Sequence, residues 1–206
     1  MTIHILRHGE TEFNRLGIVQ GSGVDTSLND IGQEQASAFF DHYGDLDFQL
    51  VVTSHLQRTH QTVARFIEKG MPWVKTPDLN EISWGEHEGL VSTPERVALY
   101  DEMIGEWKRG NFDAALPGGE TARQLGERLT RFVKWLQTRP ADRILICTHG
   151  RTMRALVSLM KGIPLSAMEG VRHANTGCYI ARLEEGNFIF ELENSTKHLE
   201  NLIVGS

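Results

Sequence analysis

Short runs of apolar and β-branched residues alternate with helical patterns along most of this chain, and this alternation constrains the fold more than any other feature. The runs typical of strands are residues 2–6, 48–53, 143–148, 177–183 and 188–192. Apolar residues recur at helical spacing in residues 28–43, 56–67, 121–136 and 153–160. Strands that alternate with helices are typical of an α/β fold. We therefore predict a three-layer sandwich, with a mostly parallel central sheet flanked by helices.

Two segments depart from the alternation. The sequence EGNF at residues 185–188 has the composition of a hairpin turn, so we expect one edge of the sheet to be antiparallel. Residues 82–120 hold Trp84, Trp107, several glycines and two prolines, which indicates a helical and loop insertion. The two tryptophans are expected to pack inside it. The chain of 206 residues fits one domain, so we assign residues 1–206 to a single domain carrying this insertion.

The bulk composition excludes several classes of protein. The formal net charge is -6, whereas nucleic-acid binders usually carry an excess of Lys and Arg. Cys147 and Cys178 both lie in apolar runs, which favours buried thiols and a reducing compartment. The N-terminus lacks the pattern of a signal peptide, and no apolar stretch approaches the roughly 20 residues of a membrane helix. We expect a cytoplasmic protein that binds neither nucleic acid nor membrane.

Cationic side chains follow three of the predicted strands. Arg7 and His8 come after the first strand, Arg58 lies just beyond the second, and His149 follows the third. In open α/β sheets, ligands bind at the carboxyl ends of the strands. These four side chains should therefore converge at one place, against the negative net charge of the whole protein.

Two arginines and two histidines at one place form an anion pocket, and guanidinium groups match the oxygens of phosphate. Backbone N–H groups at helix N-termini would add donors near Ser54, Gly150 and Thr152. A neutral histidine in such a pocket can attack phosphorus and carry the phosphoryl group. His8 suits this role, because Gly9 allows close backbone approach and its carbonyl could accept the other ring N–H.

A leaving alkoxide needs a proton, so a carboxyl group should stand nearby. Glu81 is the best candidate, since Ile82 and Trp84 provide apolar and aromatic neighbours that would favour the neutral, proton-carrying acid. The same group would then act as a base toward the water that releases phosphate. Glu86 and Glu88 are the alternatives.

Several segments of the chain together resemble a known protein family. The segments LRHGET, SHLQRTHQT, LNEISWGEHEG, PGGET and THG resemble the histidine phosphatase superfamily, in the family's order and over nearly the whole chain. That family includes cofactor-dependent phosphoglycerate mutases and many small phosphatases. The segments QGSGVDTSLNDIGQEQA and ENSTKHL are similar to further family segments.

The resemblance implies a role for each matching residue. His8 corresponds to the phosphorylated nucleophile and Glu81 to the proton donor. The remaining matches are to the phosphate pocket, Arg7, Arg58 and His149, and to positions that line it, Asn14, Gln20 and Gly21. We add Gly150 and Arg151 as substrate contacts. The family chemistry needs no metal, and we expect no other cofactor.

Within the family, the chain resembles the short phosphatase branch. Mutases carry a longer insertion after the acid, whereas here ISWGEHEGLVSTPE follows Glu81 and is acidic or neutral. His87 stands where that branch often has Trp. We therefore predict a metal-independent phosphomonoesterase that hydrolyses a small phosphorylated metabolite through a phosphohistidine. Arg151 could contact a second acidic group, which keeps a phosphoglycerate-type mutase as the alternative.

Other interpretations stay open at this stage. Thr11, Asn14 and Gln20 could serve turns rather than phosphate. Three arginines, Arg123, Arg128 and Arg131, lie at spacings that straddle a helix face, so we expect them to be solvated, with a substrate contact as the alternative for Arg123. A non-catalytic phosphate-binding protein is the third functional hypothesis. The partner we expect is a small phosphate ester, and a homodimer remains an open alternative.

Overall fold

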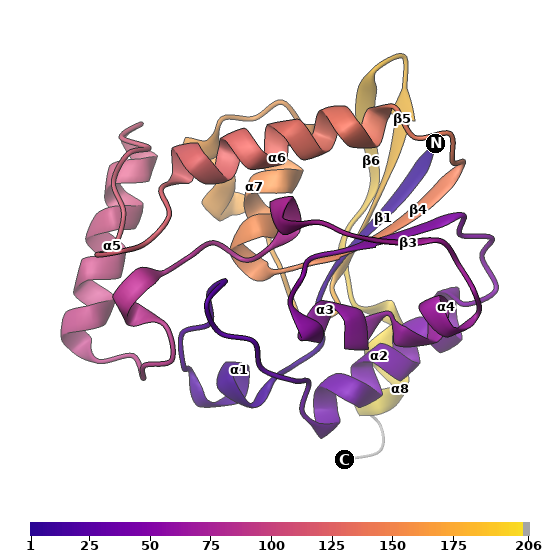
Figure 1. Ribbon diagram of the computed structural model, residues 1–206, viewed down its shortest axis with the longest axis horizontal. Coiled ribbons are helices and arrows are strands. Elements are labelled where there is room, and N and C mark those ends of the chain that lie inside the picture. The colour runs from indigo at the N-terminus through magenta and orange to yellow at the C-terminus, as the bar shows by residue number, and fades with distance from the viewer. Residues whose placement is uncertain (204–206) are drawn as a thin grey trace.

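The computed structural model describes residues 1–203, and these contain a six-stranded mixed sheet in the order β3-β2-β4-β1-β5-β6 (Figure 1). The strands are β1 (Thr2–Arg7), β2 (Leu50–Thr53), β3 (Trp73–Lys75), β4 (Arg143–Thr148), β5 (Cys178–Glu184) and β6 (Asn187–Ser195). Strands β1 to β4 run parallel, while β5 is antiparallel to both β1 and β6. The predicted α/β fold, mostly parallel sheet and antiparallel edge are confirmed. The prediction missed β3, which has only three residues.

Helices cover both faces of the sheet, with α6 and α7 on one side and α2, α3 and α4 on the other (Figure 1). The helices are α1 (Glu12–Leu16), α2 (Asp30–Tyr43), α3 (Gln57–Thr62), α4 (Ala64–Glu68), α5 (Pro94–Lys108), α6 (Ala122–Gln137), α7 (Gly150–Met160) and α8 (Glu200–Ile203). The single helix predicted over 56–67 is wrong, because the backbone leaves helical geometry at Val63 and divides it into α3 and α4. Among residues 1–203, no helix combines the length and apolarity that crossing a membrane would need.

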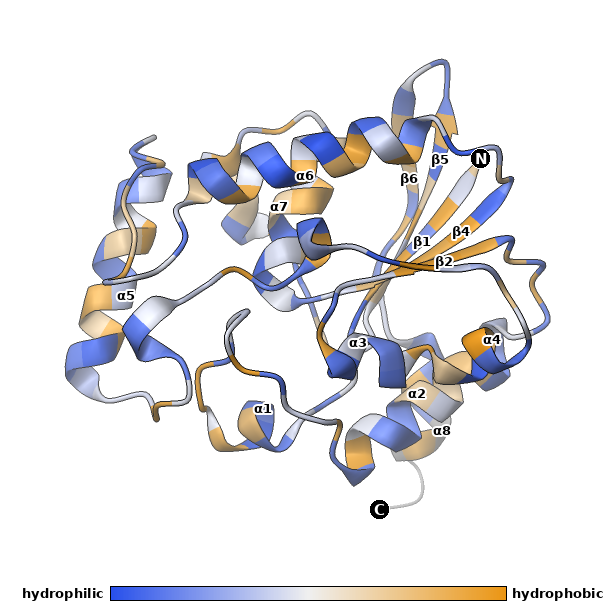
Figure 2. Ribbon diagram, viewed as in Figure 1, coloured by the Kyte–Doolittle hydropathy of each residue, from blue (hydrophilic) through white to orange (hydrophobic). Residues whose placement is uncertain are grey.

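The core explains why the strands are apolar on both faces, as Figure 2 shows for the central strands. Successive side chains of a strand point to opposite faces. Ile144 and Ile146 of β4 accordingly pack in the layer that includes α6 and α7, and Leu145 and Cys147 pack in the layer that includes α2. Both cysteines are buried free thiols, as predicted.

The insertion is held by aromatic packing and by a close backbone contact. Trp84 and Trp107 are buried, and their rings stack with centroids 6.4 Å apart, which confirms the predicted packing role. Gly85 has a φ of 56°, and a Cβ there would lie 2.1 Å from the carbonyl oxygen of Pro117. Only glycine fits this contact. It places the segment after Glu81 against the segment before α6.

The sheet order determines where the functional residues meet. Strands β2, β4 and β1 are neighbours and parallel, so their carboxyl ends lie side by side at one edge. The next segments of chain, those that follow Arg7, Thr53 and Thr148, therefore start from that edge.

Candidate active site

The three cationic clusters predicted from the strand ends do meet. The rings of His8 and His149 have centroids 5.2 Å apart, and Arg58 Nε donates to His149 Nδ1 over 3.1 Å. Arg58 and both histidines are buried, and Arg7 is half-buried beside them. The convergence follows from parallel strand order, because each residue follows its strand within a few positions.

His8 has one free ring nitrogen. Its Nδ1 lies 2.7 Å from the carbonyl oxygen of Gly9, which can only accept, so Nδ1 carries the proton and Nε2 the lone pair. Burial, followed by the charges of Arg58 and Arg7, holds the pKa of His8 well below its usual value. The ring is therefore neutral at physiological pH. Gly9 also makes the expected close approach, since a Cβ there would lie 2.6 Å from the carbonyl oxygen of Gly32.

A chain of hydrogen bonds sets the proton positions on His149. Arg58 Nε is a donor, so His149 Nδ1 accepts, and His149 Nε2 then donates to Ser54 Oγ over 2.8 Å. Ser54 Oγ also accepts from the Leu56 N–H, and it lies 3.0 Å from Thr59 Oγ1. Thr59 Oγ1 donates to the carbonyl oxygen of Leu56, so Ser54 donates to Thr59. His149 is thereby fixed as a neutral imidazole, and burial keeps its pKa well below normal.

Arg58 both supports the site and keeps donors available. Besides His149, it donates to the carbonyl oxygens of Val24 (2.7 Å) and Gly21 (3.3 Å), which fastens the loop after α1. Three of its five N–H groups are thus used, and two remain for an anion. Burial lowers its pKa to about 10, so the side chain stays cationic near neutral pH.

Arg7 presents free donors at the start of α7. Its Nη1 donates to the carbonyl oxygen of His173 over 3.0 Å, and its buried Nε has no hydrogen-bond partner among the described residues. A Cβ on Gly150 would lie 3.5 Å from that Nε and 3.2 Å from His173 Nδ1, which places Gly150 against both side chains. Burial lowers the pKa of Arg7, and the nearby Glu81 carboxylate acts in the opposite direction. Gly150 is therefore beside Arg7, as expected of a pocket residue.

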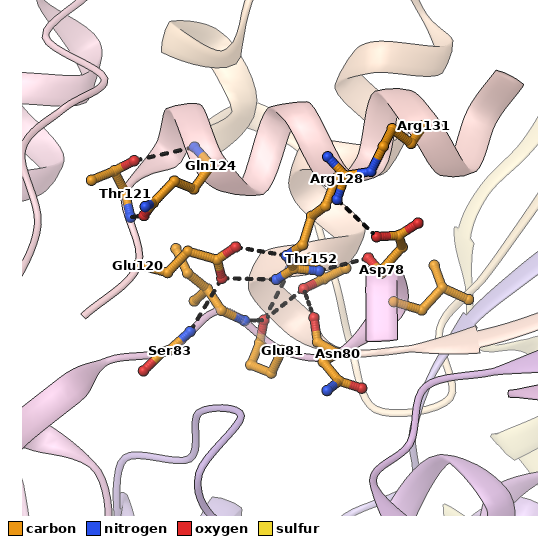
Figure 3. Close-up of polar contacts among 12 residues, drawn as sticks. Asp78, Asn80, Glu81, Ser83, Glu120, Thr121, Gln124, Arg128, Arg131 and Thr152 are labelled. Atoms are coloured by element: carbon orange, nitrogen blue, oxygen red, sulfur yellow. Dashed lines mark hydrogen bonds and ion pairs between the residues drawn. The ribbon is translucent and has the colours of Figure 1, made fainter. Parts of the chain in front are cut away.

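The buried Glu81 carboxylate is bound at the N-terminus of α7 (Figure 3). Its Oε2 accepts the Arg151 N–H at 3.0 Å, and its Oε1 accepts from the N–H groups of Thr152 (3.0 Å) and Ile82 (2.9 Å). The expected apolar setting is therefore wrong: three backbone N–H donors surround the carboxylate. A helix N-terminus favours negative charge, and His149, the N-cap residue of α7, provides no side-chain cap.

The other two candidate acids, Glu86 and Glu88, have different surroundings. Glu86 is exposed. The carboxylate of Glu88 accepts from the backbone N–H groups of Gly23 and Trp84, both at 2.8 Å, and so ties the loop after α1 to the insertion. Gly21 belongs to this junction, because a Cβ there would overlap the Glu88 carboxylate.

Three polar residues near His8 serve local structure. Thr11 is the N-cap of α1 and forms a capping box with Asn14, whose Oδ1 accepts the Thr11 N–H at 3.2 Å. Gln20 Nε2 donates to Thr11 Oγ1 over 2.7 Å, and Gln20 Oε1 accepts from Thr26. The turn interpretation of these residues thus has direct support. Of the three, Gln20 also lines the cavity between the loop after α1 and the insertion.

The Arg151 side chain does not take the place expected for a substrate contact. It is buried, it pairs with Glu169 and Tyr100, and its guanidinium carbon lies 5.5 Å from the ring centroid of Trp107. Its charge is neutralised inside the insertion, because a carboxylate and an aromatic cluster are the neighbours that α5 and the segment after α7 supply. Only the backbone N–H of Arg151 reaches the site, through Glu81.

Two residues of the site were missed by the sequence analysis. His173 receives the Arg7 hydrogen bond, and Asn175 Nδ2 donates to the carbonyl oxygen of His8 over 3.0 Å. Both precede β5, which is antiparallel to β1 and therefore starts at the edge where β1 ends. Polar residues just before β5, the strand antiparallel to β1, were the sequence signal that could have located them. Burial, followed by the charge of Arg7, lowers the pKa of His173 to about 4.

A cavity of about 430 Å³ lies between the loop after α1 and the insertion. Its lining is mixed, with aromatic, apolar and charged side chains: Val19, Gln20, Trp84, His87, Ser92, Arg96, Val97, Tyr100, Asp101 and Leu116. It thus adjoins the segments that carry Gln20 and the residues just after Glu81. A larger cavity of about 520 Å³ lies between α2 and residues 197–202, and the converged residues do not line it.

Comparisons with known proteins agree with this geometry. The family model of the histidine phosphatase superfamily (branch 1) matches residues 3–196. The chain is 29% identical over 171 residues to the 2,3-bisphosphoglycerate-dependent phosphoglycerate mutase of Bartonella henselae, covering 79% of this chain and 82% of that protein. It is 27% identical over 190 residues to the protein of the same name from Methylorubrum populi, covering 87% and 88%.

A solved structure extends the likeness to three dimensions. The alpha-ribazole phosphatase of Shigella flexneri superposes with a TM-score of 0.83 and is 26% identical, over 95% of this chain and 97% of that one. The family match spans every strand and all the converged residues. This chain therefore belongs to the histidine phosphatase superfamily.

Proposed function

We propose that this protein is a phosphomonoesterase that hydrolyses small phosphate esters through a phosphohistidine on His8, without a metal. The observation that carries the proposal is the state of His8. Its ring is neutral, its Nδ1–H is held by the Gly9 carbonyl, and its Nε2 is free beside Arg7 and Arg58. A nucleophile of defined tautomer next to two cations suits attack on phosphorus.

The first step forms a bond from His8 Nε2 to phosphorus as the ester P–O bond breaks. The bonding electrons leave with the alkoxide oxygen, which takes a proton from Glu81. Among the described residues, Glu81 Oε2 accepts a hydrogen bond only from the Arg151 N–H, so a lone pair remains for that proton. The free N–H groups of Arg7 and Arg58 would stabilise charge on the equatorial oxygens.

The second step returns the enzyme to its starting state. Water attacks the phosphohistidine, Glu81 accepts the water proton, and the P–N bond breaks to restore the Nε2 lone pair. The three backbone N–H groups that bind Glu81 hold its carboxyl group in place for this step. The reaction is balanced by water alone.

Two observations support hydrolysis over transfer between two positions of one molecule. The guanidinium of the buried Arg151 is engaged by Glu169 and Tyr100, away from the phosphate pocket, so it is not presented to a second phosphate. The 430 Å³ cavity has aromatic walls from Trp84 and Tyr100 and holds both Arg96 and Asp101. These features suit a leaving alcohol of mixed character, which we place in that cavity.

A phosphoglycerate-type mutase is the second candidate, because the two relatives compared above carry that name. It would require a bisphosphate primer and would release no net phosphate. A protein that binds phosphate without turnover would show neither activity.

The test is release of nitrophenol from p-nitrophenyl phosphate with EDTA present, across pH, with a His8→Ala variant alongside. We expect release that survives chelation and falls by about 10⁴-fold or more in the variant. Since the pKa of His8 lies well below 6.5, its neutral form persists as the pH falls, and we expect no loss of rate around pH 6.5 from this group. Release that EDTA abolishes would contradict the proposal. Conversion of 3-phosphoglycerate only with a bisphosphate primer would favour the mutase.

A further inference from the structure

An ion pair on α6 reaches the segment that carries Glu81. The guanidinium of Arg128 binds both carboxylate oxygens of Glu120, Nε to Oε1 over 2.7 Å and Nη2 to Oε2 over 2.9 Å. The two side chains are only 11% and 18% exposed. The expectation that Arg128 is solvated is therefore wrong. Figure 3 shows the Arg128 side chain extending from α6 toward Glu120 and the segment below it.

The pair holds the Glu81 segment on both sides of the acid. On one side, Arg128 Nη1 donates to the carbonyl oxygen of Asp78 over 2.6 Å. On the other side, Glu120 Oε2 accepts the Ser83 N–H at 3.4 Å, and the Glu120 N–H donates to the Ser83 carbonyl over 2.8 Å. Residues 78 and 83 are thus attached to one partly buried ion pair, with Glu81 between them.

A different element fixes the middle of the same segment. Thr152 Oγ1 donates to the carbonyl oxygen of Asn80 over 2.7 Å, and the Glu81 carboxylate rests on the N-terminus of α7. The segment is therefore clamped between α6, through Arg128, and α7, through Thr152. If Arg128 is lost, the Asp78 carbonyl loses its partner on α6, while the α7 contacts, the bond from Thr148 Oγ1 to the Leu79 carbonyl and the backbone bond between Glu120 and Ser83 still hold the segment. The position of the Glu81 carboxyl group over the phosphate pocket is then set by fewer contacts.

We propose that Arg128 and Glu120 are positioning residues for proton transfer by Glu81, an inference that rests on the proposed phosphatase reaction. Neither side chain forms a hydrogen bond or ion pair with His8, Arg7, Arg58 or His149 in the described structure, so their geometric effect passes through the backbone of residues 78–83. The Arg128 charge is, in addition, the last of several causes after burial that lower the pKa of His149. Burying an ion pair often contributes little net stability. A geometric role explains why a charged pair stands here, because the pair holds the segment of residues 78–83 in place.

The leaving group separates a positioning role from a merely structural one. Nitrophenolate departs readily without a proton, whereas a propoxide leaving group needs one. Loss of proton-donor geometry should therefore slow hydrolysis of propyl phosphate far more than hydrolysis of p-nitrophenyl phosphate. General damage to the pocket should slow both alike.

The experiment compares kcat/KM for the two esters in the wild type, Arg128→Met and Glu81→Gln. We expect Arg128→Met to lose about 30- to 100-fold on propyl phosphate and to stay within about 3-fold on p-nitrophenyl phosphate. Glu81→Gln should show the same selectivity with a larger loss. Binding of inorganic phosphate, measured by calorimetry, should stay within about 3-fold in Arg128→Met, because the phosphate pocket is untouched.

Arg123→Met is the matched control, since Arg123 lies on the same helix and pairs with Asp113 in an exposed ion pair. We expect Arg123→Met to leave kcat/KM unchanged for both esters. If Arg128→Met does not fold, Glu120→Gln tests the same attachment with nearly the same shape and should show the same selectivity. Equal losses on both esters, or no loss, in the folded variant would overturn the inference.

The outcomes also separate this inference from the proposed function. A wild type that hydrolyses p-nitrophenyl phosphate in a His8-dependent way supports the phosphatase whatever Arg128→Met does. A wild type that hydrolyses neither ester removes the phosphatase proposal and, with it, the positioning role.

Discussion

The molecule holds buried arginines in two neighbouring regions, and their surroundings differ. At the strand ends, Arg7 and Arg58 make no ion pair with any described residue and keep N–H groups free. In the insertion, Arg151 is paired with Glu169, which also binds Arg154. The same residue type therefore forms an anion site in one region and a packing element in the other. What decides between them is whether a carboxylate stands beside the guanidinium.

The difference also matters for reaction type. A site with one set of unpaired cations binds one phosphoryl group. Transfer of a phosphoryl group between two positions of one molecule needs a second set of unpaired cations. Here the second set of cations, Arg151 and Arg154, shares the carboxylate of Glu169 instead of facing the phosphate pocket. The comparison of the two regions thus favours hydrolysis, and three substitutions test it.

The largest effect is expected for Arg7→Met. It removes free donors to the phosphoryl oxygens while keeping the length of the side chain. We expect kcat/KM for p-nitrophenyl phosphate to fall by about 10²- to 10³-fold. Thermal unfolding should change little, because Arg7 has only the His173 contacts to lose. A large drop in the unfolding midpoint with little change in kcat/KM would reverse the assignment of the two regions.

Arg151→Met should show the opposite balance. It leaves the partly buried Glu169 with Arg154 alone and opens a gap among Tyr100 and Trp107. We expect the free energy of unfolding to drop by about 2 kcal/mol, measured by urea denaturation. The affinity for inorganic phosphate should hold, since the Arg151 backbone N–H still binds Glu81. Loss of phosphate affinity without loss of stability would show that the side chain serves the anion site after all.

The smallest effect is expected for Glu169→Gln, which frees the charge of Arg151 without removing it. If neutralisation by Glu169 is what keeps a second anion out, the KM for a bisphosphate such as 2,3-bisphosphoglycerate should fall by about 3- to 10-fold. The KM for p-nitrophenyl phosphate, which carries one phosphate, should not change. An unchanged KM for the bisphosphate would mean that space, rather than charge, excludes the second group.

Much of the fold was predictable because the strands are short apolar runs and the helices between them have clear spacing. The interruption of a helix and the shortest strand were not predictable. Val63 ends a helix that the pattern continues, and β3 has too few residues to show a periodicity. In the site, Arg7, His8, Arg58 and His149 were found because each lies at the end of a parallel strand or within a few residues of it. His173 and Asn175 were missed, because they precede an antiparallel strand and reach the site from the far end of the chain.

By itself, the sequence determined which residues gather at the phosphate end. Local patterns define the strands, and parallel order then brings their carboxyl ends together, so no knowledge of side-chain contacts is needed. Only the tertiary structure decided the partners of the long polar side chains. Glu81 rests on α7, Arg151 turns to Glu169, and Arg128 is buried against Glu120. Such pairings depend on segments far apart in the chain meeting at hydrogen-bond distance, which is a property of packing and not of local pattern.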